Sequence, residues 1–88
     1  MTSEFLVIVF KSVHFAIKGE DLLKADYEIK IMPTPREISS SCGVSIRIKH
    51  EDMDSLVAVL EKEIEEFTVY QILDEASGKS VNVLYKKE

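Results

Sequence analysis

The run FLVIVF at residues 5–10 decides the fold of this chain. Six consecutive apolar residues that include valine and isoleucine are typical of a central β-strand covered on both sides. The run is far shorter than the roughly 20 residues that a membrane-spanning helix needs. We therefore predict a buried strand over residues 5–10, with the other elements arranged around it.

A helix is predicted immediately after this strand. Ser12 is a favoured helix-capping residue, and apolar residues recur after it at helical spacing from Val13 to about Ala25. Gly19 falls on the predicted buried face. Glycine inside a helix costs about 0.5 to 1 kcal/mol relative to alanine, so we expect a close approach of helix and sheet to offset that cost. The predicted buried face consists of Phe15, Ala16, Gly19, Leu22 and Leu23.

The rest of the chain carries four more strand patterns and one more helix pattern. Alternating apolar and polar residues predict half-buried strands, and apolar residues at spacings of three and four predict a helix. The resulting order is β-α-β-β-α-β with an extra C-terminal strand. This order predicts an α+β fold of the ferredoxin-like split βαβ type. The patterns place strands at 27–31, 44–48, 68–73 and 81–85, and the second helix at about 51–66.

Length and charge restrict the class of protein. A chain of 88 residues fits a single domain over residues 1–88. The 16 acidic and 11 basic residues give a formal charge of −5, the wrong sign for attraction to a phosphate backbone. Nucleic acid is therefore not an expected partner, and the short apolar run at 5–10 makes a membrane an unexpected one as well. The chain also lacks the pattern of a secretory signal, so we expect a cytoplasmic protein.

Cys42 is the only cysteine in the chain. An internal disulfide is therefore excluded, and a reducing compartment would keep the thiol free. His14 and His50 show no metal-ligand spacing with Cys42. We expect neither a metal nor another cofactor.

The connection from Pro33 to Gly43 is unusually long. It joins two strands expected to pair antiparallel, where two to five residues are usual, and it has about eleven. Pro35 favours an extended Thr34, which stiffens the start of the loop. Three serines ending in Ser41 precede the cysteine, and Gly43 would permit a positive φ or a close backbone approach. Extra length of this kind needs a functional or structural reason.

Three interpretations of the loop follow from its residues. In the first, backbone N–H groups together with Arg36 or His14 stabilise the thiolate of Cys42 and make it nucleophilic. In the second, Cys42 is a small buried residue that only fills space. In the third, the serine-rich turn and Arg36 bind a small phosphate or carboxylate without thiol chemistry.

The predicted topology brings several of these residues to one end of the sheet. If both crossovers are right-handed, the third strand lies antiparallel between the first and second. The start of the first helix, the Pro33–Gly43 loop and the entry to the fourth strand then lie together. Strands are about 4.8 Å apart, so the first and second are separated by roughly 10 Å, a gap that side chains can bridge. His14 and Cys42 could therefore share a site.

The loop also resembles a known family. The run Pro33-Thr34-Pro35-Arg36-Glu37-Ile38-Ser39-Ser40-Ser41-Cys42-Gly43 is similar to the hallmark of the putative selenium/sulfur carrier protein-like family, and Ser12-x-His14-x-Ala16 resembles it as well. The similarity covers about Glu4 to Phe67. It implies a cytoplasmic protein of selenium or sulfur handling, with the family cysteine at Cys42.

The sequence hypothesis is a small sulfur or selenium carrier rather than an enzyme. Cys42 would accept the chalcogen as a persulfide or selenosulfide, and its partners would be donor and acceptor proteins. The alternative is a regulatory or adaptor domain that binds an anionic ligand or a protein through the same loop. A structural subunit that forms a homodimer through its last strand is a third alternative. The supporting or binding residues would be Arg36, His14, Ser12, Thr34, Ser41 and Gly43.

Overall fold

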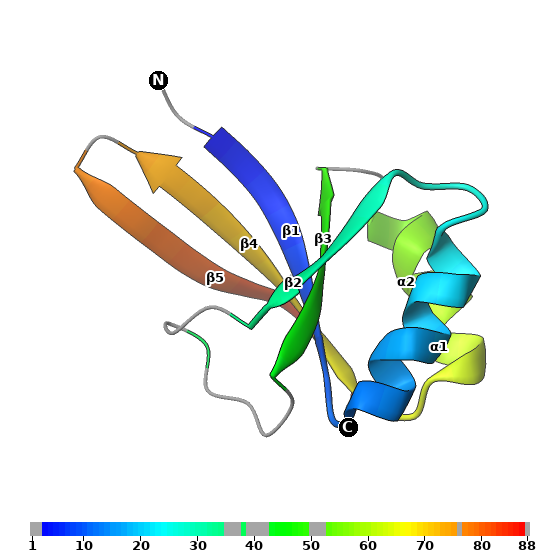
Figure 1. Ribbon diagram of the computed structural model, residues 1–88. Coiled ribbons are helices and arrows are strands. Elements are labelled where there is room, and N and C mark those ends of the chain that lie inside the picture. Colours follow the sequence, from blue (N-terminus) through cyan, green and yellow to red (C-terminus); the bar gives the residue numbers. More distant parts are fainter. Residues whose placement is uncertain (1–2, 35–37, 39–42, 50–52, 76, 88) are drawn as a thin grey trace.

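The computed structural model describes residues 3–34, 38, 43–49, 53–75 and 77–87. They form an α+β fold with two helices and one five-stranded antiparallel sheet (Figure 1). The strands are β1 (Ser3–Phe10), β2 (Ile29–Pro33), β3 (Val44–Lys49), β4 (Phe67–Glu75) and β5 (Gly78–Lys87), and the helices are α1 (Val13–Leu23) and α2 (Met53–Glu63).

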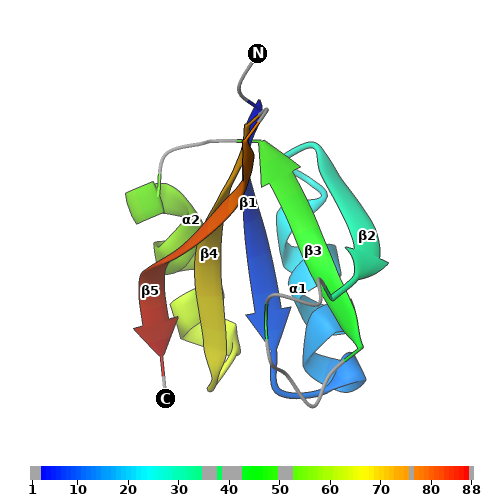
Figure 2. The ribbon, with the colours of Figure 1, turned by 90° about the vertical axis from the view of Figure 1, so that its left-hand side faces the viewer.

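The sheet has the strand order β2-β3-β1-β4-β5. Every neighbouring pair is antiparallel, so β3 lies antiparallel between β1 and β2, as predicted. The predicted sequence of elements is also present, including the extra strand at the edge. Both helices lie on one face of the sheet, and the other face, here called the open face, carries no helix of the described residues (Figure 2).

The central strand β1 is buried on both sides. Leu6, Ile8 and Phe10 belong to the core between sheet and helices, whereas Val7 and Val9 belong to a smaller apolar cluster on the open face. All five side chains are at most 6% exposed. The predicted covering of β1 on both faces is therefore confirmed.

Gly19 allows α1 to pack closely on the sheet. A Cβ atom at this position would lie 2.6 Å from Cζ and 2.9 Å from Cε1 of Phe10, and 3.4 Å from Cδ1 of Ile46. Phe10 is 1% exposed, so its ring has little room to move away. The expected close approach of helix and sheet is confirmed.

The ends of several elements differ from the predictions. Helix α1 ends at Leu23 rather than near Ala25, and beyond its end the backbone N–H of Asp26 bonds to the carbonyl of Leu23 at 3.2 Å, the i→i−3 spacing of a turn. Helix α2 ends at Glu63 rather than Glu66. Strand β2 runs over Ile29–Pro33 rather than 27–31, and β4 continues to Glu75. Local patterns fix such ends poorly, since turns and pairing partners decide them.

Strand β5 forms hydrogen bonds with the end of α2. The hydroxyl of Tyr85 donates a hydrogen bond to a carboxylate oxygen of Glu61. The Nζ atom of Lys87 donates to the carbonyl oxygens of Glu61 and Ile64, at 2.7 and 2.9 Å. A lysine at this position satisfies carbonyls that a helix end leaves without partners. The extra strand is thus tied to both the sheet and the helix layer.

No helix among the described residues has the length and apolar character that crossing a membrane requires.

Candidate functional site

The strand register places the predicted site elements at one end of the sheet. Phe10, the last residue of β1, pairs with Phe67 at the start of β4, and Pro33 at the end of β2 pairs with Val44 at the start of β3. Helix α1 begins directly after β1, at the same end. The start of α1, the ends of the Pro33–Gly43 loop and the entry to β4 therefore lie together, as predicted (Figure 2).

The base of the loop is closed by backbone and side-chain hydrogen bonds. The N–H of Thr34 donates to the carbonyl of Gly43 at 3.1 Å, which extends the β2–β3 ladder by one step. The hydroxyls of Thr34 and Ser45 are 2.7 Å apart and share a hydrogen bond. Ser45 is fully buried, although its position in the alternating pattern of β3 predicted a solvent-facing side chain. Its bond to Thr34 removes the cost of burying the hydroxyl.

Ile38 holds the middle of the loop against the open face. It is 5% exposed and packs with Val7, Val9 and Ile72. This contact explains why the open-face residues of β1 are buried without a helix above them. Ile38 is not among the residues predicted for the site, and the signal that could have found it is a lone aliphatic residue within a polar loop.

Two of the predicted supporting residues lie at the start of α1. Ser12 has the extended backbone of a helix cap, and its Oγ accepts a hydrogen bond from the N–H of Phe15 at 3.4 Å. The predicted cap is confirmed. His14 is exposed, with its ring centroid 6.0 Å from that of Phe15. Among the described residues, no group of three or more histidines, cysteines and carboxylates could hold a metal ion.

Three predicted site residues lie outside the described residues: Cys42, Arg36 and Ser41. The shared site of His14 and Cys42 therefore stays a prediction, as does the arrangement of N–H groups around the thiolate. What the structure provides is the frame of that site, formed by the Thr34–Gly43 closure and the Ile38 contact.

Gly43 is the last residue of the loop and is described in the structure. Its φ lies outside the left-handed region, and a Cβ atom there would meet none of the described residues within 4 Å. The part of Gly43 in the site stays a prediction. Gly43 takes part in the loop base through its carbonyl group, which any residue could supply.

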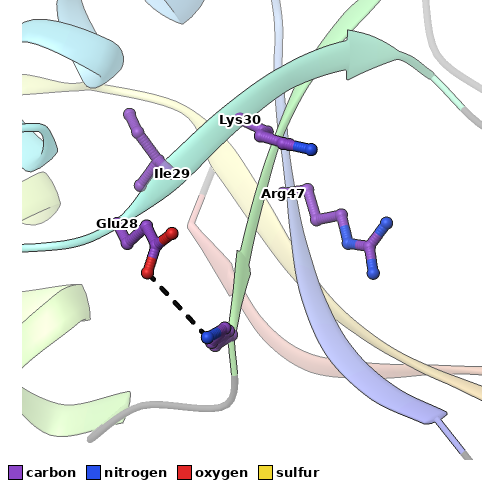
Figure 3. A pocket seen from close by; sticks show the side chains of 5 residues that line it. Glu28, Ile29, Lys30 and Arg47 are labelled. Atoms are coloured by element: carbon purple, nitrogen blue, oxygen red, sulfur yellow. Dashed lines mark ion pairs between the residues drawn. The ribbon is translucent and has the colours of Figure 1, made fainter.

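A second candidate site lies further along the β2–β3 pair, away from the loop. It is a cavity of about 220 Å³ on the sheet edge (Figure 3). Lys30 and Arg47 project to the same side of the strand pair in Figure 3, and Lys49 forms an ion pair with Glu28 at 3.8 Å. The sequence analysis did not identify this site. Its lining residues are Glu28, Ile29, Lys30, Arg47 and Lys49.

Comparison with known proteins assigns the chain to a protein family. The family described as "Putative Se/S carrier protein-like" matches residues 5–76. The chain belongs to this Se/S carrier protein-like family. The match includes the whole Pro33–Gly43 loop, both helices and most of the first four strands, whereas β5 lies beyond it. No curated protein and no solved structure matches the chain.

Proposed function

We propose that this member of the Se/S carrier protein-like family carries sulfur or selenium on the thiol of Cys42. The observation that carries the proposal is the family match over residues 5–76, a segment that includes the chain's only cysteine. A carrier of this kind needs a reducing compartment, and the cytoplasm fits that need. Its partners would be proteins that donate and accept the chalcogen.

The loading step is a thiol exchange without net oxidation. The Cys42 thiolate attacks the terminal sulfur of a cysteine persulfide on the donor protein. The donor's S–S bond breaks, its cysteine leaves as a thiolate, and a new S–S bond forms on Cys42. A donor that carries selenium would react in the same way and leave a selenosulfide on Cys42. Delivery is the reverse exchange, with an acceptor thiolate as the attacking group.

The geometry around the loop supports a carrier role. The loop is anchored at its base by Thr34 and Gly43 and in its middle by Ile38. A cysteine held on such a frame can be presented to a partner without unfolding the sheet. In this proposal Arg36 and His14 favour the thiolate, while Ser41 and Gly43 shape the loop.

We also infer that the fold is the ferredoxin-like split βαβ arrangement with β5 appended. The strand order β2-β3-β1-β4 with antiparallel neighbours supports this inference. In this arrangement the two crossover helices cover one face and leave the other for contacts.

The test of the carrier role is sulfur transfer from a cysteine desulfurase. The intact protein is incubated with the desulfurase and cysteine and then weighed by mass spectrometry. We expect a mass gain of one sulfur atom that is absent in Cys42→Ser and reversed by a thiol reductant. A known carrier protein serves as positive control. If that control is loaded and this chain is not, the proposal fails.

A second measurement addresses activation of the thiol. The alkylation rate of Cys42 is followed against pH, and the carrier role predicts an apparent pKa below the ordinary cysteine value of about 8.5. Arg36→Ala and His14→Ala should each move that pKa upward. An apparent pKa at or above about 8.5 in the unmodified chain would contradict an activated thiolate.

A further inference from the structure

Two positively charged side chains lie directly opposite each other on β2 and β3. Lys30 pairs in register with Arg47, and both residues are exposed. Like charges in directly opposite positions destabilise a sheet. Among the described residues, the ion pair of this cavity joins Lys49 to Glu28, and neither Lys30 nor Arg47 forms an ion pair with a carboxylate. No carboxylate of the described residues therefore offsets the repulsion within this pair.

Arg47 is held in place by an aromatic ring. Its guanidinium carbon lies 4.1 Å from the ring centroid of Phe5, a cation–π contact. Phe5 belongs to the partly buried rim of the open-face cluster. The guanidinium is thus positioned before any ligand arrives, which lowers the entropy cost of binding.

The side chains that line the cavity carry a net positive charge, although the chain as a whole is negative. Its three cations, Lys30, Arg47 and Lys49, and its one carboxylate, Glu28, give a local charge of +2, whereas the whole chain has −5. The Lys49 and Glu28 side chains are 79% and 86% exposed. A site this exposed cannot enclose a small molecule, since small-molecule sites bury 70–90% or more of a drug-sized ligand. It suits a macromolecule that contacts a wider surface.

An apolar surface adjoins the cations on the open face. Met32 lies two residues along β2 from Lys30, and Met32, Phe5 and Tyr70 each pack, partly buried, against the open-face cluster. No helix of the described residues covers this face (Figure 2). A partner can therefore place carboxylates on the cations and apolar side chains against the partly buried Phe5 and Met32.

We propose that the β2–β3 side of the open face binds an extended acidic segment of a partner protein. Carboxylates fit the planar fork of Arg47 and the point charge of Lys30. Strand β2 is the outer strand of the sheet, so an extended segment can lie along it. The chain's overall charge of −5 disfavours a nucleic acid at the same place. This proposal does not depend on the chemistry of Cys42.

The test uses a defined peptide and a pair of matched variants. A fluorescent seven-residue peptide with alternating glutamate and valine is titrated with the intact protein, and a peptide with glutamine in place of glutamate is the ligand control. The double variant Lys30→Gln/Arg47→Gln removes the site cations. The double variant Lys18→Gln/Lys62→Gln removes the same charge from the helix layer. Thermal unfolding checks that both remain folded.

We expect the acidic peptide to bind more tightly than the glutamine peptide and to lose affinity as salt rises. The Lys30/Arg47 double variant should weaken binding about tenfold or more, and the Lys18/Lys62 variant less than about twofold. In the unmodified chain, peptide-induced amide shifts should lie in β2, β3 and β1.

Several results would overturn the proposal. They are no binding of the acidic peptide at millimolar concentration, equal losses in the two double variants, or amide shifts centred on the helices. Tighter binding of inorganic phosphate or of an oligothymidylate than of the acidic peptide would also overturn it, because the site would then serve a small anion or a nucleic acid.

Discussion

Replacing Gly19 with alanine tests the packing of α1 on the sheet. In a solvent-exposed helix this change stabilises the folded state by about 0.5 to 1 kcal/mol. Here the new methyl group would lie 2.6 Å from Cζ of Phe10. Neither group can move freely, since Gly19 and Phe10 are both buried. Extra atoms in a packed core cost about 1 to 3 kcal/mol.

The gain in helix stability and the cost of overpacking change the free energy of unfolding in opposite directions, and the overpacking cost is larger. We expect Gly19→Ala to lower the free energy of unfolding by about 1 kcal/mol after the helix gain is subtracted. For a domain of this size that corresponds to a fall in Tm of about 4 to 8 °C. Thermal unfolding followed by far-ultraviolet circular dichroism measures it directly.

Gly43→Ala is the matched control. Its φ is outside the left-handed region and its Cβ position is empty, so alanine there should be neutral or stabilise the fold by up to about 1 kcal/mol. A Phe10→Leu background should reduce the cost of Gly19→Ala, because the shorter side chain removes the clashing ring atoms. A Tm for Gly19→Ala equal to or above that of the unmodified protein would refute the reasoning.

Three further predictions concern single interactions. Ser12→Ala should lower stability by about 1 kcal/mol through loss of the α1 cap, whereas Ser12→Asp should retain it; equal losses in a denaturant titration would argue against capping. Thr34→Val should cost about 1 to 3 kcal/mol because it leaves the buried Ser45 hydroxyl without this partner, and adding Ser45→Ala should recover part of the loss; strictly additive losses would contradict the pair. The pKa of Tyr85 is raised above its ordinary value of 10. The largest cause is the hydrogen bond to the Glu61 carboxylate, and burial and the negative charge of that carboxylate act in the same direction. The contribution of this hydrogen bond to stability is therefore complete below about pH 10 and is lost as pH rises through the pKa of folded Tyr85. Subtracting the absorbance titration of Tyr85→Phe from that of the unmodified chain should show one tyrosine that ionises at higher pH than the ordinary value.

Much of the fold could be predicted because local and tertiary preferences agree. The FLVIVF run at 5–10 is apolar on both sides, and the structure covers both sides. Ser12 is a good cap by its chemistry alone and acts as one. A glycine on the apolar face of a helix has few explanations other than close packing, and Gly19 packs closely. These features lie within one element or between neighbouring elements.

The features that could not be predicted depend on contacts between distant segments. Ser45 reads as a solvent-facing residue in an alternating strand, but it is fully buried and shares a hydrogen bond with Thr34, eleven residues away. Nothing in the local sequence around Ile38 shows which face it covers. The docking of Lys87 on the end of α2 likewise joins segments far apart in the chain.

The candidate sites also include one feature that could be predicted from sequence and one that could not. The loop and its cysteine stand out in sequence by length and composition, and they lie within the segment that the family match covers, while their role in a site stays a prediction. The pair of Lys30 and Arg47 could not be found from sequence, because they become neighbours only through the β2–β3 register. A charged residue in an alternating strand is ordinary until its cross-strand partner is known.

The position of β1 also has a consequence for the order of folding. Phe5 on this strand pairs with Lys49 on one side and with Ile72 on the other, so both of its ladders join segments far apart along the chain. Such pairings form slowly, since the loss of loop entropy comes before the gain from contacts. The β4–β5 hairpin, with its turn at Gly78, is local, and amide exchange during refolding should protect it before β1. We therefore expect β1, which contributes most to both apolar clusters, to pair with its neighbours late in folding.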